Sequence, residues 1–138
     1  MRGTLFRGPA GVVLVVLALS ACTDDQPPFC DDLRSLRPLI SDLRERRAED
    51  DIPGAAPILD DLAEAYQAIR PPDAIAGDWV TAIDFFRYFA SEARAAGRRD
   101  PRSPVSPTQD RLYDEAFTRI TDYGVAECDA ERGYLVPP

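Results

Sequence analysis

The sequence predicts an all-α protein, an up-down-up-down four-helix bundle closed by a disulfide between Cys30 and Cys128. In four segments the apolar residues recur three and four positions apart, which is the period of an amphipathic helix. Proline and glycine separate these segments by short connections, so consecutive helices are expected to be antiparallel. That topology brings the start of the first helix and the end of the fourth to one end of the bundle, where the two cysteines would meet.

The first two helices are expected from about Phe29 to Glu49 and from about Ala56 to Arg70. The first has an apolar seam that consists of Phe29, Leu33, Leu36, Ile40 and Leu43. Pro38 is expected to kink this helix, because a proline removes one backbone hydrogen bond. The second helix has Pro57 at or near its first position, where a missing N–H is tolerated.

The third helix is expected from about Pro72 to Ala96, and the fourth from Ser106 toward Cys128, after a loop from 97 to 105. The third has an apolar stripe, widened by two further aromatic residues: Ile75, Trp79, Ile83, Phe86 and Ala90, with Phe85 and Phe89. Ser106 and Gln109 form the pattern of a capping box, in which each side chain caps the backbone N–H of the other residue.

The first 21 residues have the features of an export signal. Arg2 and Arg7 precede the apolar run 12–19, which is shorter than the roughly 20 apolar residues of a membrane-spanning helix. The next residues, Leu19-Ser20-Ala21-Cys22, resemble the lipobox of bacterial lipoproteins. The resemblance implies that a diacylglyceryl group is attached to Cys22 and that the chain is cut after Ala21. An ordinary secretory signal followed by a coincidental cysteine is the alternative.

The chain is therefore expected to consist of a signal peptide (1–21), a lipidated tether (22–29), a helical bundle (30–129) and an extended tail (130–138). The processed chain would have 117 residues, the size of one domain. Its formal net charge would change from −8 to −10, because two of the 16 basic residues lie in the signal. Such an acidic surface argues against nucleic acid as a partner. We expect a monomer without a cofactor.

Three cysteines are an odd number for an exported protein. If Cys22 carries lipid, Cys30 and Cys128 remain as an even pair in an oxidising compartment. Their disulfide would close a loop of nearly the whole domain, which is worth about 4–5 kcal/mol in the chain-entropy model. The alternative is a pair of reactive thiols, for which neither a CxxC spacing nor a histidine is present.

Four pairs of adjacent acids are candidates for a metal site or a proton-sharing dyad: Asp24–Asp25, Asp31–Asp32, Asp50–Asp51 and Asp60–Asp61. Adjacent helical residues point about 100° apart, so helix-start electrostatics and solvation explain these pairs better. No metal is expected. The chain has no histidine for a catalytic triad and no lysine for a Schiff base, so we do not expect an enzyme. Hydrolysis by carboxylates alone is the least favoured function.

Arginines gather at the end of the bundle that the topology places away from Cys22. Arg46 and Arg47 close the first helix, and Arg98, Arg99 and Arg102 lie in the loop after the third, with Arg44 and Arg94 nearby. These guanidinium groups suit phosphate or carboxylate groups of a partner or an envelope polymer. The alternative pairs them with acids close by in the sequence. Outward-facing aromatic residues, Phe85 or Tyr88, would line a groove for a ligand or a partner helix.

The whole pattern loosely resembles small helical lipoproteins of actinobacteria to which no activity is assigned. The residues that carry this resemblance are Cys22, Cys30, Pro71, Pro72, Trp79 and Cys128. The resemblance implies a helical fold and a location on the outer face of the cell membrane, but no activity. The expected function is a lipid-anchored binding or accessory module that recognises an envelope protein or polymer. A carrier of a small apolar ligand within the bundle is the alternative.

Overall fold

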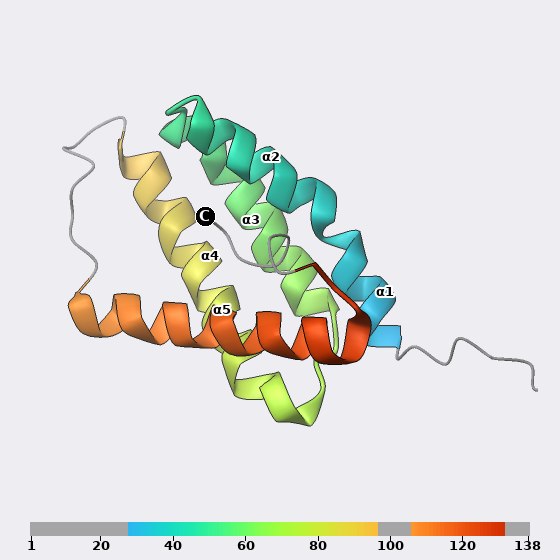
Figure 1. Ribbon diagram of the computed structural model, residues 1–138. Helices are drawn as coiled ribbons and strands as arrows, with labels where there is room; N and C mark the ends of the chain where they lie inside the picture. The colour runs from blue at the N-terminus through green and yellow to red at the C-terminus, as the bar shows by residue number, and fades with distance from the viewer. Residues whose placement is uncertain (1–27, 97–105, 132–138) are drawn as a thin grey trace, which may run out of the picture.

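The computed structural model describes residues 28–96 and 106–131, and within these ranges the chain is helical without a strand (Figure 1). The elements are α1 (Pro28–Ser35), α2 (Arg37–Ala48), α3 (Ile52–Ala68), a 3-10 turn η1 (Asp73–Ile75), α4 (Ala76–Ala96) and α5 (Pro107–Cys128). Since α1 and α2 are the two halves of the first predicted helix, the predicted all-α four-helix fold is confirmed. The expected signal peptide and the loop 97–105 lie outside the described residues, as does most of the expected tail.

The break between α1 and α2 is the kink expected from Pro38. It falls at Leu36, and Pro38 takes a place in the first turn of α2, where its missing N–H is not needed. The backbone stays partly paired across the break, because the N–H of Leu36 donates to the carbonyl of Leu33. Leu33, Leu36 and Ile40 are all buried, so the apolar seam runs through the kink without interruption.

The start of α3 differs from the prediction. We expected the helix from about Ala56, but it begins at Ile52. The side chain of Asp51 accepts a hydrogen bond from the N–H of Gly54 at 3.0 Å and so caps the first turn. Pro53 stands in that first turn, and Pro57 lies inside the helix. A capping aspartate followed by a proline in the first turn is a stronger signal for the start of a helix than the second proline alone.

The predicted cap of α5 is half confirmed. The hydroxyl of Ser106 accepts a hydrogen bond from the N–H of Gln109 at 3.2 Å. The side chain of Gln109 does not reach back; its amide donates to the hydroxyl of Tyr113 at 2.7 Å. The reciprocal part of the capping box was therefore wrong, because the Gln109 side chain is directed one turn along the helix to Tyr113 and not back to the N–H of Ser106.

The helices α2, α3 and α4 form a layer with α3 in the middle, in contact with both neighbours. Among the described elements, α2 contacts neither α4 nor α5. The last helix returns to the end at which α1 begins, as expected, but it crosses the layer steeply instead of running along it (Figure 1). It thereby contacts α4, η1 and α1. None of the helices in the described part of the chain is both long and apolar enough to cross a membrane.

Candidate functional site

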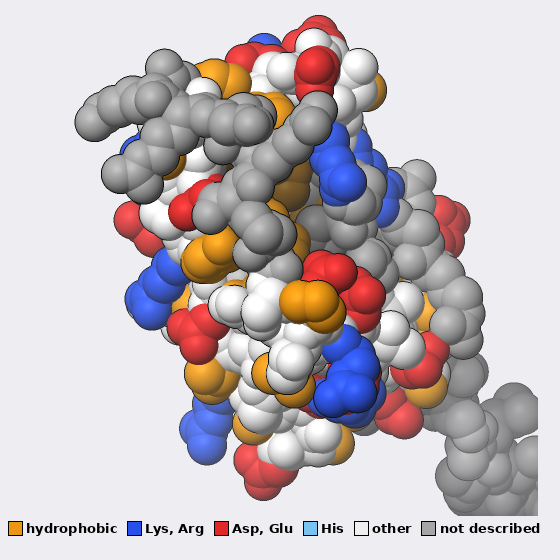
Figure 2. All heavy atoms as spheres, turned by 90° about the vertical axis from the view of Figure 1, so that its left-hand side faces the viewer, with side chains coloured by type: hydrophobic (Ala, Val, Ile, Leu, Met, Phe, Trp, Pro, Cys, Tyr) orange, Lys and Arg blue, Asp and Glu red, His pale blue; other side chains and the backbone are white. Residues whose placement is uncertain are grey.

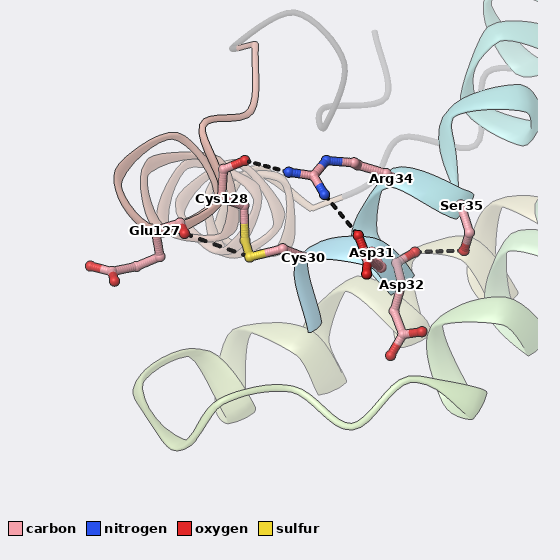
Figure 3. Close-up of polar contacts among 7 residues, drawn as sticks. All are labelled: Cys30, Asp31, Asp32, Arg34, Ser35, Glu127 and Cys128. Atoms are coloured by element: carbon pink, nitrogen blue, oxygen red, sulfur yellow. Dashed lines mark hydrogen bonds and ion pairs between the residues drawn. A yellow bond between two sulfur atoms is a disulfide. The ribbon is translucent and has the colours of Figure 1, made fainter. Parts of the chain in front are cut away.

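A disulfide joins the two ends of the helical domain. Cys30, in the first turn of α1, is bonded to Cys128, the last residue of α5, with a Cα–Cα distance of 5.2 Å (Figure 3). Both cysteines are buried. The predicted pairing is confirmed, and the alternative of two reactive thiols was wrong.

Arg34 completes this junction, and the sequence had not pointed to it. Its guanidinium donates to the carbonyl of Cys128 at 3.3 Å and pairs with Asp31 at 2.8 Å (Figure 3). A cation at the carbonyl end of α5 interacts favourably with the helix dipole. The Sγ of Cys30 lies 3.6 Å from the carbonyl oxygen of Glu127, which is a contact and not a hydrogen bond, because a bridged sulfur has no proton. Helix α1 is thus tied to the end of α5 by one covalent bond and one charged hydrogen bond.

An aromatic cluster fills the core beside this junction. The rings of Tyr66 and Trp79 are stacked at 4.2 Å, and Phe29 meets Trp79 edge-on at 5.3 Å. The Nε1 of Trp79 donates to the backbone carbonyl of Tyr66 at 2.8 Å. That carbonyl belongs to the last turn of α3, where carbonyls lack a partner within the helix. Trp79 therefore packs the core and closes the end of α3.

Two buried hydroxyl groups have no hydrogen-bond partner among the described residues, the Oη of Tyr66 and the Oγ1 of Thr121. Burial raises the pKa of Tyr66, because the charged phenolate is disfavoured away from water. Tyr66 is fully withdrawn from solvent. Its hydroxyl is therefore a neutral group inside the core and is not presented to the outside.

The aromatic residues expected to face outward are largely packed. Phe85 meets Tyr113 and Phe117 of α5 edge-on, at 5.1 Å and 5.0 Å. Tyr88 is half-buried and contacts Phe89. The large apolar residues that are exposed in the described chain stand on three different helices: Ile52, Val80 and Leu112. Apolar residues scattered in this way are ordinary and do not form a docking patch.

Arginines were expected to gather at the end of the bundle away from Cys22, here called the tip. Those of them that the structure describes are mixed with acidic residues. Arg46 lies 3.4 Å from both Glu49 and Asp51, and Arg94 pairs with Asp60. Pairing with acids nearby in the sequence thus holds for Arg46. Arg47 is exposed, whereas Arg98, Arg99 and Arg102 lie outside the described residues. Figure 2 shows acidic and basic side chains interspersed over the visible face, so the described surface there has no large area of one sign.

Most of the acid pairs have structural partners. Asp31 pairs with Arg34, Asp51 caps α3 and Asp60 pairs with Arg94. No group of three or more potential metal-ligating residues gathers in the described ranges. The pair Asp24–Asp25 lies outside them.

One further ion pair was not apparent from the sequence. Both Nε and Nη2 of Arg119 donate to the same carboxylate oxygen of Asp78, at 2.8 Å and 2.6 Å. Only 14% of the Asp78 side chain is exposed, and the hydrogen bond raises the pKa of Arg119. The pair joins the first turn of α4 to the middle of α5. No spacing rule finds it, because the two residues lie 41 positions apart.

No family model matches the chain, and neither a curated protein nor a solved structure is similar to it.

Proposed function

We propose that this protein is a lipid-anchored module on the outer face of the cytoplasmic membrane, which binds a protein or polymer of the envelope. The Cys30–Cys128 disulfide is the observation that carries the proposal. Disulfides persist in oxidising compartments and are rare in the cytosol. The export signal and the lipobox-like Leu19-Ser20-Ala21-Cys22 agree with that compartment.

The short tether supports a fixed position close to the membrane. The first helix begins at Pro28, so only residues 23–27 separate it from Cys22. An extended chain spans at most 3.3–3.6 Å per residue, so acylated Cys22 would hold α1 within about 20 Å of the bilayer. The Cys30–Cys128 end of the domain would then face the lipid. The turn between α2 and α3 lies at the opposite end and would face outward (Figure 1).

The anchor is tested by mass spectrometry of the protein purified from membranes. The expected mass is that of residues 22–138 with acyl groups on Cys22 and with one disulfide, between Cys30 and Cys128. Cys22→Ser is expected to leave the signal uncut, whereas Cys30→Ala with Cys128→Ala is expected to leave acylation unchanged. An unmodified Cys22 in a protein released from membranes would contradict the anchor.

Binding is tested by crosslinking in cells, followed by capture from solubilised envelopes. Arg98→Glu with Arg99→Glu, and Arg46→Glu with Arg47→Glu, are expected to reduce capture of the crosslinked partner at least about tenfold if guanidinium groups contact its anions. Arg111→Glu is the matched control, since Arg111 is an exposed arginine of α5 outside the proposed tip. Equal capture by all variants would show that these arginines do not contact the partner. The proposal of a lipid anchor would be unaffected by that result.

A further inference from the structure

Helix α1 is attached to the rest of the domain near each of its two ends. Among the described elements, its backbone comes close only to α2, which follows it in the chain, and to α5, to which the disulfide joins it. Its length is eight residues, whereas an isolated helix shorter than about 12–15 residues is only marginally stable in water. The position of α1 therefore depends on these two attachments.

The attachment to α2 is a weak point in the helical backbone. Pro38 has no N–H to donate to the carbonyl of Arg34, four residues earlier, so the hydrogen bonds of α1 do not continue into α2. At the break itself, the N–H of Leu36 donates to the carbonyl of Leu33 over 3.3 Å, which is long for such a bond. Because helices bend where backbone hydrogen bonds are lost, Leu36 is the point about which α1 can turn.

The attachment to α5 lies among negative charges. Carboxylates stand on both sides of the disulfide: Asp31 and Asp32 on α1, and Glu127 and Asp129 at the end of α5 (Figure 3). Arg34 offsets part of this charge, since it pairs with Asp31 at 2.8 Å and donates to the carbonyl of Cys128 at 3.3 Å. The remaining carboxylates repel one another across the junction, and the covalent bond holds α1 in place against that repulsion.

In this position α1 covers part of the aromatic cluster. The ring of Phe29 meets Trp79 of α4 edge-on at 5.3 Å and Tyr123 of α5 edge-on at 5.8 Å. The indole of Trp79 is also stacked on Tyr66 of α3. A movement of α1 away from α5 would therefore remove Phe29 from Trp79 and leave the stack between α3 and α4 in place.

We propose that the Cys30–Cys128 disulfide is a redox latch on α1, and that its reduction lets α1 turn about Leu36 and uncover Trp79. The step is a thiol–disulfide exchange with a dithiol. The bond between the two Sγ atoms breaks, each sulfur gains one electron and one proton, and the dithiol becomes a disulfide. The apolar contacts of Phe29 and Leu33 then hold α1 without the bond, and α1 exchanges between a docked and a released state.

Burial of the disulfide determines when the latch responds. Both cysteines are buried, so a dithiol gains access only during brief local openings of this end of the domain. The latch therefore responds to a sustained reducing environment and not to a short exposure to reductant.

Release of α1 also changes the reach of the domain, a consequence that rests on the proposed lipid anchor. Helix α1 is the first helix after Cys22, so its eight residues would be added to the tether. Eight extended residues span about 26–29 Å. The reduced module would thus reach further from the membrane than the oxidised one. The latch itself does not depend on the anchor, because it concerns the domain alone.

The latch is tested on residues 22–138, produced without the signal and with Cys22→Ala. Amide hydrogen exchange and acrylamide quenching of Trp79, the single tryptophan of the chain, are measured before and after treatment with dithiothreitol. In the reduced protein α1 is expected to exchange at least about tenfold faster than in the oxidised protein, and at least about tenfold faster than α3 and α4. The quenching constant of Trp79 is expected to rise at least about twofold as Phe29 leaves the indole.

Cys30→Ala with Cys128→Ala is the matched control, because it has no bond to reduce. It is expected to show fast exchange in α1 from the start and no response to dithiothreitol. Unchanged exchange and quenching after reduction of the two cysteines would overturn the latch. Equal exchange rates in α1, α3 and α4 of the reduced protein would also overturn it, because the bond would then stabilise the whole domain instead of holding one helix.

Discussion

The indole Nε1 of Trp79 donates to the backbone carbonyl of Tyr66 at 2.8 Å, and the two rings are stacked upon each other at 4.2 Å. The bond joins the second turn of α4 to the last turn of α3, across the turn that contains Pro71 and Pro72. Because α3 ends at Ala68, this carbonyl has no intrahelical partner, and the indole supplies one inside the core. One side chain thus fixes how the two most extensively packed helices meet.

Trp79→Phe tests this role. Phenylalanine keeps an aromatic ring but loses the donor and leaves the Tyr66 carbonyl unpaired in a smaller core. The free energy of unfolding is expected to fall by about 2–4 kcal/mol, from the cavity and the lost hydrogen bond together. Urea denaturation followed by circular dichroism measures the loss. Val80→Ala, at the exposed neighbouring position, is expected to change stability by less than about 0.5 kcal/mol. Equal stability of Trp79→Phe and the unchanged protein would contradict the role.

Tyr66→Phe is expected to act in the opposite direction. The hydroxyl of Tyr66 is buried without a partner, so its removal leaves the ring stack and is expected to stabilise the protein by about 1 kcal/mol at pH 7. The pKa of Tyr66 is raised in the fold, whereas in the unfolded chain it is near its ordinary value of about 10. Above that pH the unfolded chain therefore loses a proton that the folded chain keeps.

This proton linkage gives Tyr66→Phe a second readout. Because the pKa of Tyr66 is higher in the folded than in the unfolded chain, ionisation of this residue does not lower the stability of the unchanged protein below about pH 10, but it does so progressively as the pH rises further. The stability of the unchanged protein is thus expected to fall more steeply above this pH than that of Tyr66→Phe. Urea midpoints measured between pH 7 and pH 11 compare the slopes. Tyr123→Phe serves as the control, and parallel curves for the unchanged protein and Tyr66→Phe would argue against a buried neutral phenol.

The sequence predicted the features that repeat along the chain. The spacing of Leu33, Leu36 and Ile40 predicted a helical seam, because burial of one face requires an apolar residue at every turn. The disulfide followed from an odd cysteine count together with a topology that brings Cys30 to Cys128. These predictions needed no knowledge of interatomic distances.

Interactions between distant positions could not be predicted in this way. Arg34 and Cys128 are 94 residues apart, and Asp78 and Arg119 are 41 apart. Such pairs depend on how the helices cross, and the steep crossing of α5 has no counterpart in the spacing of its residues. The early start of α3 was also missed, because Asp51 was interpreted as one of an acid pair and not as a cap.

Loss of the disulfide is expected to cost much of the stability of the domain. The bond closes a loop between residues that are 98 positions apart. Cys30→Ala with Cys128→Ala is expected to lower the free energy of unfolding by about 4–5 kcal/mol, chiefly because the unfolded chain gains freedom. Thermal unfolding of the double variant and of the unchanged protein measures the difference. Cys22→Ala, measured in the chain produced without its signal, is expected to unfold like the unchanged protein. A double variant as stable as the unchanged protein would show that the junction is held by packing and Arg34 alone.

The cap of α3 predicts an unusual response at Gly54. Replacing a glycine by alanine inside a helix ordinarily stabilises it by about 0.5–1 kcal/mol. At Gly54, however, a methyl group would overlap with the carboxylate of Asp51 that accepts the N–H of the same residue. Gly54→Ala is therefore expected to gain almost nothing, since it disturbs a cap that is itself worth about 1 kcal/mol.

A double-mutant cycle separates these two effects. Asp51→Ala alone is expected to lower stability by about 1 kcal/mol through loss of the cap. In the Asp51→Ala background no carboxylate opposes the new methyl group, so Gly54→Ala should there recover the ordinary gain of about 0.5–1 kcal/mol. Urea denaturation of the four proteins gives the coupling energy, and Asp61→Ala on the exposed side of α3 controls for the lost charge. Additive effects would mean that Asp51 does not cap Gly54 in solution, and α3 would then have to begin nearer to Ala56, as its second proline had suggested.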